Sequence, residues 1–263
     1  MIRKAISAFL NYSGFELRRK TQLERADDPY YVLSLLLNRK EITTIIDGGA
    51  SIGDTSLILS DLFPDAEVYA FEPYDPFVEI LKEKTKDRSR IRIESFALDE
   101  VEGSRTMIVN ESEGTNSFFS ANQSKNQPYG DLLRKKGEIE VTSKTLDQWA
   151  VDNQINVIDL IKLDLQGNEL AALRGAISQL SSKNVKAILC EVSFIPQYEN
   201  QPIASEVMTM INSYDFDLFN LYQMHYHHGQ LIQADALFLH KSIYKKSIKA
   251  TKALFLPHSR FLR

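Results

Sequence analysis

From residue 43 onward, short runs of apolar residues alternate with longer segments in which apolar residues recur at helical spacing. The first run, residues 43–47 (TTIID), has no polar alternation, which is typical of a strand buried on both faces. Strands that alternate with helices predict a mostly parallel α/β sheet with helices on both faces. The predicted strands are 43–47, 67–72, 91–98, 157–164, 185–192, 216–222 and 234–240, and the predicted helices are 54–63, 73–86, 146–153, 169–180 and 203–213.

The pattern also divides the chain into regions. No helical segment separates the last two strands, so we expect an antiparallel last strand. Residues 99–146 contain two strand-like runs around a polar stretch and predict an inserted hairpin or extended loop. We expect residues 1–40 to form an N-terminal helical cover, residues 41–240 to form the α/β domain, and residues 241–263 to form a basic C-terminal tail.

Composition is that of an ordinary globular protein, with 43% hydrophobic and 25% charged residues among 263. The net charge of −4 argues against nucleic acid as the main ligand. Basic residues concentrate at the ends: residues 241–263 hold seven and no acid. Solvated terminal helices explain this pattern, and so does weak contact with an anionic membrane surface. The sequence leaves both interpretations open, together with the oligomeric state.

Cysteine usage and hydropathy bear on location. Cys190 is the only cysteine, so an internal disulfide cannot form, which fits a reducing compartment. No run of about 18 apolar residues exists, and the apolar stretch near the start is too short for a typical signal core. We therefore expect a cytoplasmic protein.

A glycine-rich turn follows the first strand, in the sequence DGGASIG. Glu72 ends the next strand, where a carboxylate can accept hydrogen bonds from both ribose hydroxyls. Asp47, at the end of the first strand, would repel the pyrophosphate of a dinucleotide but suits the amino group of a methionine moiety, directly or through water. The pattern thus favours S-adenosylmethionine over NAD, although such a turn also occurs where it only packs a helix on a sheet.

Several motifs, in the same order, resemble the FkbM family of methyltransferases. They are DGGASIGDTS, YAFEPYDPFVEILK, FALDEVEG, TSKTLDQW and IDLIKLDLQGNELAALRGA, and the resemblance covers about residues 43–240. It implies a Rossmann-like methyltransferase fold, S-adenosylmethionine as donor, and often a sugar or natural-product hydroxyl as acceptor. Together with the turn, it gives the predicted cofactor residues Asp47, Gly48, Gly49, Ser51, Gly53, Glu72, Ala97 and Leu98.

A hydroxyl acceptor is a weak nucleophile and benefits from a base within hydrogen-bond reach. Three carboxylates at or near strand ends are the predicted catalytic residues: Asp164, Glu191 and Asp235. The same three could gather around one hard cation, so a divalent metal is left open. The predicted substrate-binding residues are Asn116, Ser117, His225 and His227, and the three histidines 225, 227 and 228 are expected in the turn before the last strand.

One position departs from the resembled family. Gln166 stands where the family usually has an acid, so any role of that acid in holding a metal or substrate is in doubt for this chain. The sequence therefore predicts an S-adenosylmethionine-dependent O-methyltransferase acting on a small molecule or glycan. An NAD-linked oxidoreductase and a non-catalytic module that kept the fold are the alternatives.

Overall fold

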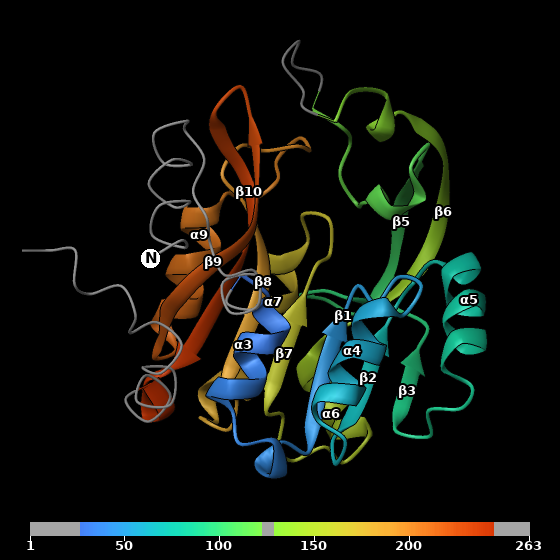
Figure 1. The fold of residues 1–263 in the computed structure, drawn as a ribbon. Coiled ribbons are helices and arrows are strands. Elements are labelled where there is room, and N and C mark those ends of the chain that lie inside the picture. Colours follow the sequence, from blue (N-terminus) through green and yellow to red (C-terminus); the bar gives the residue numbers. More distant parts are fainter. Residues whose placement is uncertain (1–26, 123–128, 245–263) are drawn as a thin grey trace, which may run out of the picture.

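A seven-stranded sheet forms the centre of the computed structural model, which describes residues 27–122 and 129–244 (Figure 1). The strand order is β3-β2-β1-β7-β8-β10-β9. The bounds are β1 (Thr44–Gly48), β2 (Glu67–Phe71), β3 (Ile91–Glu94), β7 (Leu160–Leu163), β8 (Ala187–Ser193), β9 (Phe216–His227) and β10 (Gln230–His240).

Strands β1, β2, β3, β7 and β8 pair in parallel, and β10 is antiparallel to both β8 and β9. The predicted mostly parallel sheet with an antiparallel last strand is confirmed. The chain crosses from one half of the sheet to the other between β3 and β7, which places the carboxyl ends of β1 and β7 at the switch in strand order. Ligands of open α/β sheets bind beyond the carboxyl ends of the strands at such a point.

Helices cover both faces of the sheet, as predicted. On one face α3 (Pro29–Leu36), α4 (Asp54–Leu62) and α5 (Asp75–Thr85) contribute to an apolar core. On the other face the core includes residues of α6 (Leu146–Asp152), α7 (Glu169–Arg174), α8 (Ile177–Ser181) and α9 (Ala204–Ser213). None of the helices in the described ranges is long and apolar enough to cross a membrane.

The first of these helices begins at a typical capping residue. Asp28 is the N-cap of α3, and its side chain accepts hydrogen bonds from the backbone N–H groups of Tyr30 and Tyr31. The Asp28–Pro29 pair thus starts a helix where the sequence predicts one. Most of the predicted N-terminal cover, residues 1–26, and of the basic tail, residues 245–263, lies outside the described residues.

A second, three-stranded sheet has the order β4-β6-β5, with β4 (Ala97–Leu98), β5 (Gly103–Asn110) and β6 (Lys135–Lys144). Strands β5 and β6 pair antiparallel. They stand above one side of the main sheet in Figure 1, in green. The predicted strand 91–98 is therefore wrong as one strand, because the chain leaves the main sheet after Glu94 and joins the second sheet at Ala97.

The predicted helix 169–180 is also two helices, with Gly175 between them. A Cβ on Gly175 would lie 2.0 Å from the backbone oxygen of Asp99, so the residue that follows β4 approaches the chain closely here. The break between α7 and α8 coincides with this contact.

The amino ends of three strands are joined by one buried carboxylate. Asp159 Oδ2 accepts hydrogen bonds from the backbone N–H of Thr43 at 2.7 Å and of Thr44 at 3.1 Å, and Asp159 also pairs with Lys186. Burial opposes ionisation, but these hydrogen bonds outweigh it and lower the pKa of Asp159. Asp159 therefore fixes β1, β7 and β8 at the end of the sheet opposite the strand tips.

Candidate functional site

The glycine-rich turn after β1 lies against the loop after β7. Gly49 has a φ of +74°, and its N–H and that of Ala50 donate to the Phe71 carbonyl oxygen at 3.0 and 2.9 Å. A Cβ on Gly49 would lie 1.8 Å from the backbone oxygen of Asp164. Only glycine combines this backbone conformation with so close an approach. The glycine-rich turn and the backbone of Asp164 are therefore in direct contact.

A first cavity opens beyond β1, β2 and β4. Five of the predicted cofactor residues line it: Gly49, Ser51, Glu72, Ala97 and Leu98. Much of the remaining wall is apolar, from Phe71, Phe77, Met107 and Phe118. Asp47, Gly48 and Gly53 are not among its lining residues. Gly48 and Gly53 shape the turn instead, and Gly53 is the N-cap of α4 with a φ of +91°.

Glu72 presents a largely buried carboxylate to this cavity. Its two oxygens accept the backbone N–H of Ser51 at 2.8 Å and of Tyr74 at 2.9 Å. Burial raises the pKa of Glu72 to about 7, against the opposing effect of these two hydrogen bonds. The carboxylate is thus held in place by the backbone and lines the cavity that the predicted cofactor residues share.

The inserted segment supplies the opposite wall of the first cavity. Asn116, Ser117 and Phe118 line it. Ser117 Oγ donates to the backbone oxygen of Gln166 at 2.6 Å, which ties the segment to the loop after β7. The Asn116 amide nitrogen is buried and has no hydrogen-bond partner. Asn116 and Ser117, predicted to bind substrate, therefore lie on the side of the predicted cofactor residues.

Asp47 is completely buried. Its Oδ2 accepts a hydrogen bond from Ser56 Oγ at 2.6 Å, and its Oδ1 lies 3.3 Å from Lys162 Nζ. Direct contact of Asp47 with a methionine amino group does not fit this structure, because the carboxylate is enclosed. The reason is strand register, since Asp47 of β1 is aligned with Lys162 of β7 on the same face of the sheet.

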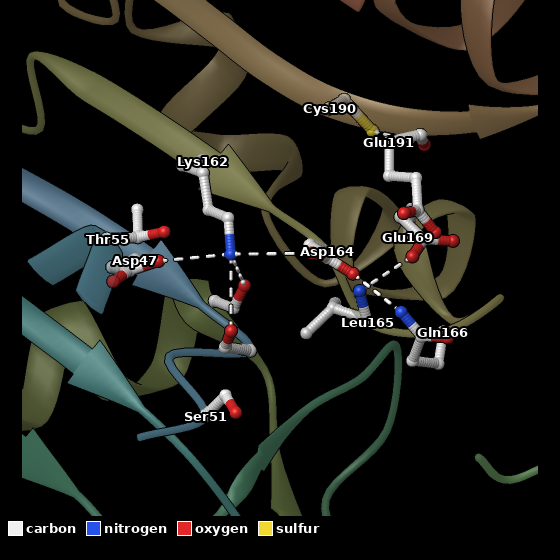
Figure 2. A network of polar contacts seen from close by, with 12 residues as sticks. Asp47, Ser51, Thr55, Lys162, Asp164, Leu165, Gln166, Glu169, Cys190 and Glu191 are labelled. Atoms are coloured by element: carbon white, nitrogen blue, oxygen red, sulfur yellow. Dashed lines mark hydrogen bonds and ion pairs between the residues drawn. The ribbon is translucent and has the colours of Figure 1, made fainter. Parts of the chain in front are cut away.

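Lys162 lies between two carboxylates, as Figure 2 shows: Asp47 on one side and Asp164, 4.0 Å away, on the other. Burial lowers the pKa of Lys162, but the charges of Asp47 and Asp164 outweigh burial and raise it. The ammonium group is therefore charged at neutral pH.

A second, mainly polar cavity lies on the face covered by α3 and α4. The three predicted catalytic residues Asp164, Glu191 and Asp235 all line it, together with His225 and Lys162. Tyr30 of α3 and Thr55 of α4 close it from the helical layer. Asp164 lines both cavities, so the two cavities meet at this side chain.

Glu191 and Asp235 are directly opposite each other on β8 and β10. Burial, followed by the Asp164 charge, raises the pKa of Asp235 to about 6, while Lys162 opposes the increase. Burial and then Asp164 raise the pKa of Glu191 well above its ordinary value. The cavity thus holds two carboxyls with raised pKa values, and Asp235 is in the range that acid–base chemistry near neutral pH requires.

Among the described residues, Asp164, Glu169 and Glu191 bring one carboxylate oxygen each within 4.8 Å of one another. Oxygen ligands at such spacing could hold a hard cation. The sequence-based trio included Asp235 and missed Glu169. Glu169 Oε1 accepts the backbone N–H of Leu165 at 2.6 Å and of Gly167 at 3.2 Å, so this carboxylate also shapes the loop after β7.

Gln166 is hydrogen-bonded on both sides of its amide. Its Nε2 donates to Asp164 Oδ1 at 2.8 Å, and its Oε1 accepts from the Tyr198 hydroxyl at 2.9 Å. An acid at this position could not donate to Asp164 while ionised. Gln166 therefore orients the carboxylate that separates the two cavities.

The histidines are in a strand, which corrects the predicted turn. His225 and His227 belong to β9, and only His228 lies in the turn that follows. His225 lines the second cavity, whereas His227 does not line either cavity and its ring stacks edge-on with His228 at 4.1 Å. The strand is longer than predicted because its pairing with β10 continues to His227.

Sequence reasoning passed over four residues of the site: Tyr30, Thr55, Phe118 and Glu169. Lys162 is not among the predicted site residues either. A signal for Lys162 was available, because Lys162 and Asp164 are two residues apart in a strand and so share a face. No comparable signal places Tyr30 and Thr55, because they reach the cavity from two helices.

Comparison with known proteins identifies relatives. The family model described as "Methyltransferase FkbM domain" matches residues 47–218. The chain is 25% identical over 189 residues to 2-O-methyltransferase NoeI of Sinorhizobium fredii, covering 70% of this chain and 76% of NoeI. It is 23% identical over 197 residues to methyltransferase sdnD of Sordaria araneosa, covering 66% of this chain and 73% of sdnD.

Among solved structures, methyltransferase FkbM from Methylobacillus flagellatus shares the fold, with a TM-score of 0.50 and 18% identity. The similarity covers 81% of this chain and 48% of that chain, so the present chain spans about half the length of that structure.

Proposed function

The chain belongs to the methyltransferase FkbM domain family, and from this premise we propose that it transfers the methyl group of S-adenosylmethionine to a hydroxyl of a small, hydroxyl-rich acceptor. The observation that carries the proposal is the position of Asp164, which lines both cavities. A donor in the first cavity and an acceptor in the second meet at that side chain.

The first cavity fits the nucleoside part of the donor. The Glu72 carboxylate at the end of β2 can accept hydrogen bonds from the two ribose hydroxyls. The apolar wall that includes Phe77 and Phe118 suits the adenine ring. The unpartnered amide nitrogen of Asn116 can donate to a ring nitrogen of the base, which would satisfy a buried polar group.

The second cavity fits a polar acceptor. Its volume is about 240 Å³, below the roughly 300–1,000 Å³ of typical sites for drug-sized ligands. Its lining residues include three acids, Asp164, Glu191 and Asp235, together with Gln223 and Gln233. Such a wall favours a hydroxyl-bearing ring over a large apolar metabolite. The printed name of the relative NoeI, a 2-O-methyltransferase, supports oxygen as the atom methylated.

When bound, S-adenosylmethionine supplies a methyl group already activated by its positive sulfur. The chain has to align the acceptor oxygen with that methyl group and to accept a proton. Asp235 would accept the proton of the acceptor hydroxyl as its oxygen is methylated by the bound donor. Asp164, held by Gln166, orients the acceptor where the two cavities meet.

Calorimetric titration and thermal unfolding test the donor. We expect S-adenosylmethionine to bind and, at 100 times its dissociation constant, to stabilise the fold by about 2.7 kcal/mol. Glu72→Gln should weaken binding roughly 10- to 100-fold, because a charged acceptor for the ribose is lost. Stabilisation by NAD and none by S-adenosylmethionine would overturn the proposal.

Turnover tests the acceptor. We expect S-adenosylhomocysteine to accumulate with sugars that have free vicinal hydroxyls, and not with their fully O-methylated forms. Equal turnover with amine or thiol acceptors of the same size would contradict the assignment of a hydroxyl acceptor. A protein that binds the donor and turns over none of these acceptors would fit the non-catalytic module instead.

A further inference from the structure

Lys162 is the only lysine or arginine among the described residues that line the two cavities. Its ammonium group lies at their junction: Nζ is 3.2 Å from the carbonyl oxygen of Gly49, which lines the first cavity, and 4.0 Å from Asp164, which lines both. The nearby ionisable side chains of the second cavity are mostly acids. A ligand carboxylate that reaches this junction therefore meets a single fixed cation.

The contacts of Lys162 are long for a buried ammonium group. Nζ lies 3.2 Å from the oxygen of Gly49, 3.3 Å from Asp47 Oδ1 and 3.4 Å from the oxygen of Gly48. Charge-assisted N–H···O bonds are usually about 2.7–2.9 Å. The exposed pairs Lys82–Glu79 and Lys84–Asp54 reach 2.7 Å. These contacts involve all three N–H donors of Lys162, so a ligand carboxylate that came closer would replace one of the long contacts. Asp47 Oδ1 has no hydrogen bond of good geometry.

Other donors near the turn are mostly occupied. The backbone N–H groups of Gly49 and Ala50 donate to Phe71, and that of Ser51 donates to Glu72. The adjacent start of α4 has no side-chain cap, and Thr55 in its first turn lines the second cavity beside Lys162. A helix N-terminus without a capping side chain adds to the attraction for an anion.

We infer that Lys162, beside the point where the two cavities meet, binds the α-carboxylate of S-adenosylmethionine. This inference rests on the proposed function. It reverses the pairing expected from the sequence: Asp47 does not hold the cofactor's amino group but holds Lys162, which holds the cofactor's carboxylate. Asp47 is then a positioning residue that acts through Lys162.

Decarboxylated S-adenosylmethionine, which lacks only the α-carboxylate, tests the assignment in a calorimetric titration without acceptor. We expect the unaltered protein to bind S-adenosylmethionine roughly 10- to 100-fold more tightly than the decarboxylated compound. Lys162→Gln should lose that preference by weakening S-adenosylmethionine binding alone. The double variant Asp47→Asn/Lys162→Gln should behave in the same way and leaves no unpaired buried charge.

Lys186→Gln is the matched control, because Lys186 also pairs with a buried aspartate, Asp159, at the far end of the strands. It should keep the full preference for S-adenosylmethionine. Equal binding of both compounds by the unaltered protein would overturn the inference, as would an equal loss of both in Lys162→Gln. If the unaltered protein binds neither compound, the proposed function itself fails.

Discussion

Asp235 has the acidity expected of a general base that works near neutral pH. Its pKa of about 6 results chiefly from burial, with a further contribution from the Asp164 charge. A base with such a pKa is mostly ionised at pH 7.5 and is still basic enough to accept a proton in the transition state. Burial and the Asp164 charge also raise the pKa of Glu191 well above its ordinary value.

Asp235→Asn should therefore lower kcat roughly 100- to 10,000-fold, the usual contribution of a general base. In the unaltered protein kcat should rise with pH through about 6, as the Asp235 carboxyl loses its proton. Initial rates of S-adenosylhomocysteine formation between pH 5 and 8.5 measure both effects.

Asp61→Asn serves as the control, since Asp61 is exposed on α4 and pairs with Arg88 at the surface. It should leave the rate and its pH dependence unchanged. If the Asp235→Asn variant keeps the full kcat and the same rise of kcat with pH near 6, another group accepts the proton.

At the scale of single residues, the sequence predicts which acids lie at the carboxyl ends of the strands. It does not predict which side chains those acids contact. It identifies acids at 47, 72, 164, 191 and 235 from their places in the strand pattern. It cannot show that Asp47 faces Lys162, because that requires knowing that β1 and β7 are neighbours and in which register. The structure shows that Asp47 is a partner of Lys162, which the sequence pattern does not reveal.

Among the elements, the turn between β1 and α4 has the least freedom to vary. Gly49→Ala would place a Cβ 1.8 Å from a backbone oxygen at a φ of +74°, and backbone cannot move aside as a flexible side chain can. We expect the free energy of unfolding to fall by at least about 2 kcal/mol. Donor binding should weaken as well, because Gly49 lines the first cavity.

Gly137→Ala in β6 is the matched control, because a Cβ there meets no atom within 4 Å. Urea unfolding of both variants gives the comparison. If the two substitutions have equal effects on stability, the turn does not impose the constraint described.

Elements with clear periodicity are predictable, and those set by contacts between distant segments are not. The alternation of strands and helices gives the main sheet and its antiparallel last strand. The separation of β4 from β3 depends on pairing with β6, more than 40 residues away in the chain. Likewise β9 extends through its histidines because β10 pairs with it, and the polar sequence there gives no sign of a strand.

For the molecule as a whole, the buried carboxyls of the site make stability depend on pH. Burial raises the pKa of Glu72 from 4.5 to about 7 and that of Asp235 from 3.8 to about 6. Both groups bind protons more strongly in the folded chain than in the unfolded chain. The folded state therefore loses stability as pH rises from about 5 to about 7.5.

We expect the Tm of the ligand-free protein to fall between pH 5 and 8, corresponding to a loss on the order of a few kcal/mol. Thermal unfolding monitored by circular dichroism at constant ionic strength measures this change. The double variant Glu72→Gln/Asp235→Asn should show a flatter dependence. A Tm that rises over this range would mean that these carboxyls are not buried as described.

The hydrogen bonds of Asp159 bear on how such a protein can be re-engineered. Asp159 joins the amino ends of β1, β7 and β8, while the cavities lie at the opposite tips of the strands. Substitutions that recruit a new acceptor at those tips leave its hydrogen bonds intact. In a library of variants confined to the lining residues of the second cavity, the contacts that align β1, β7 and β8 would stay unchanged. Variants with altered specificity could therefore be selected without loss of folding.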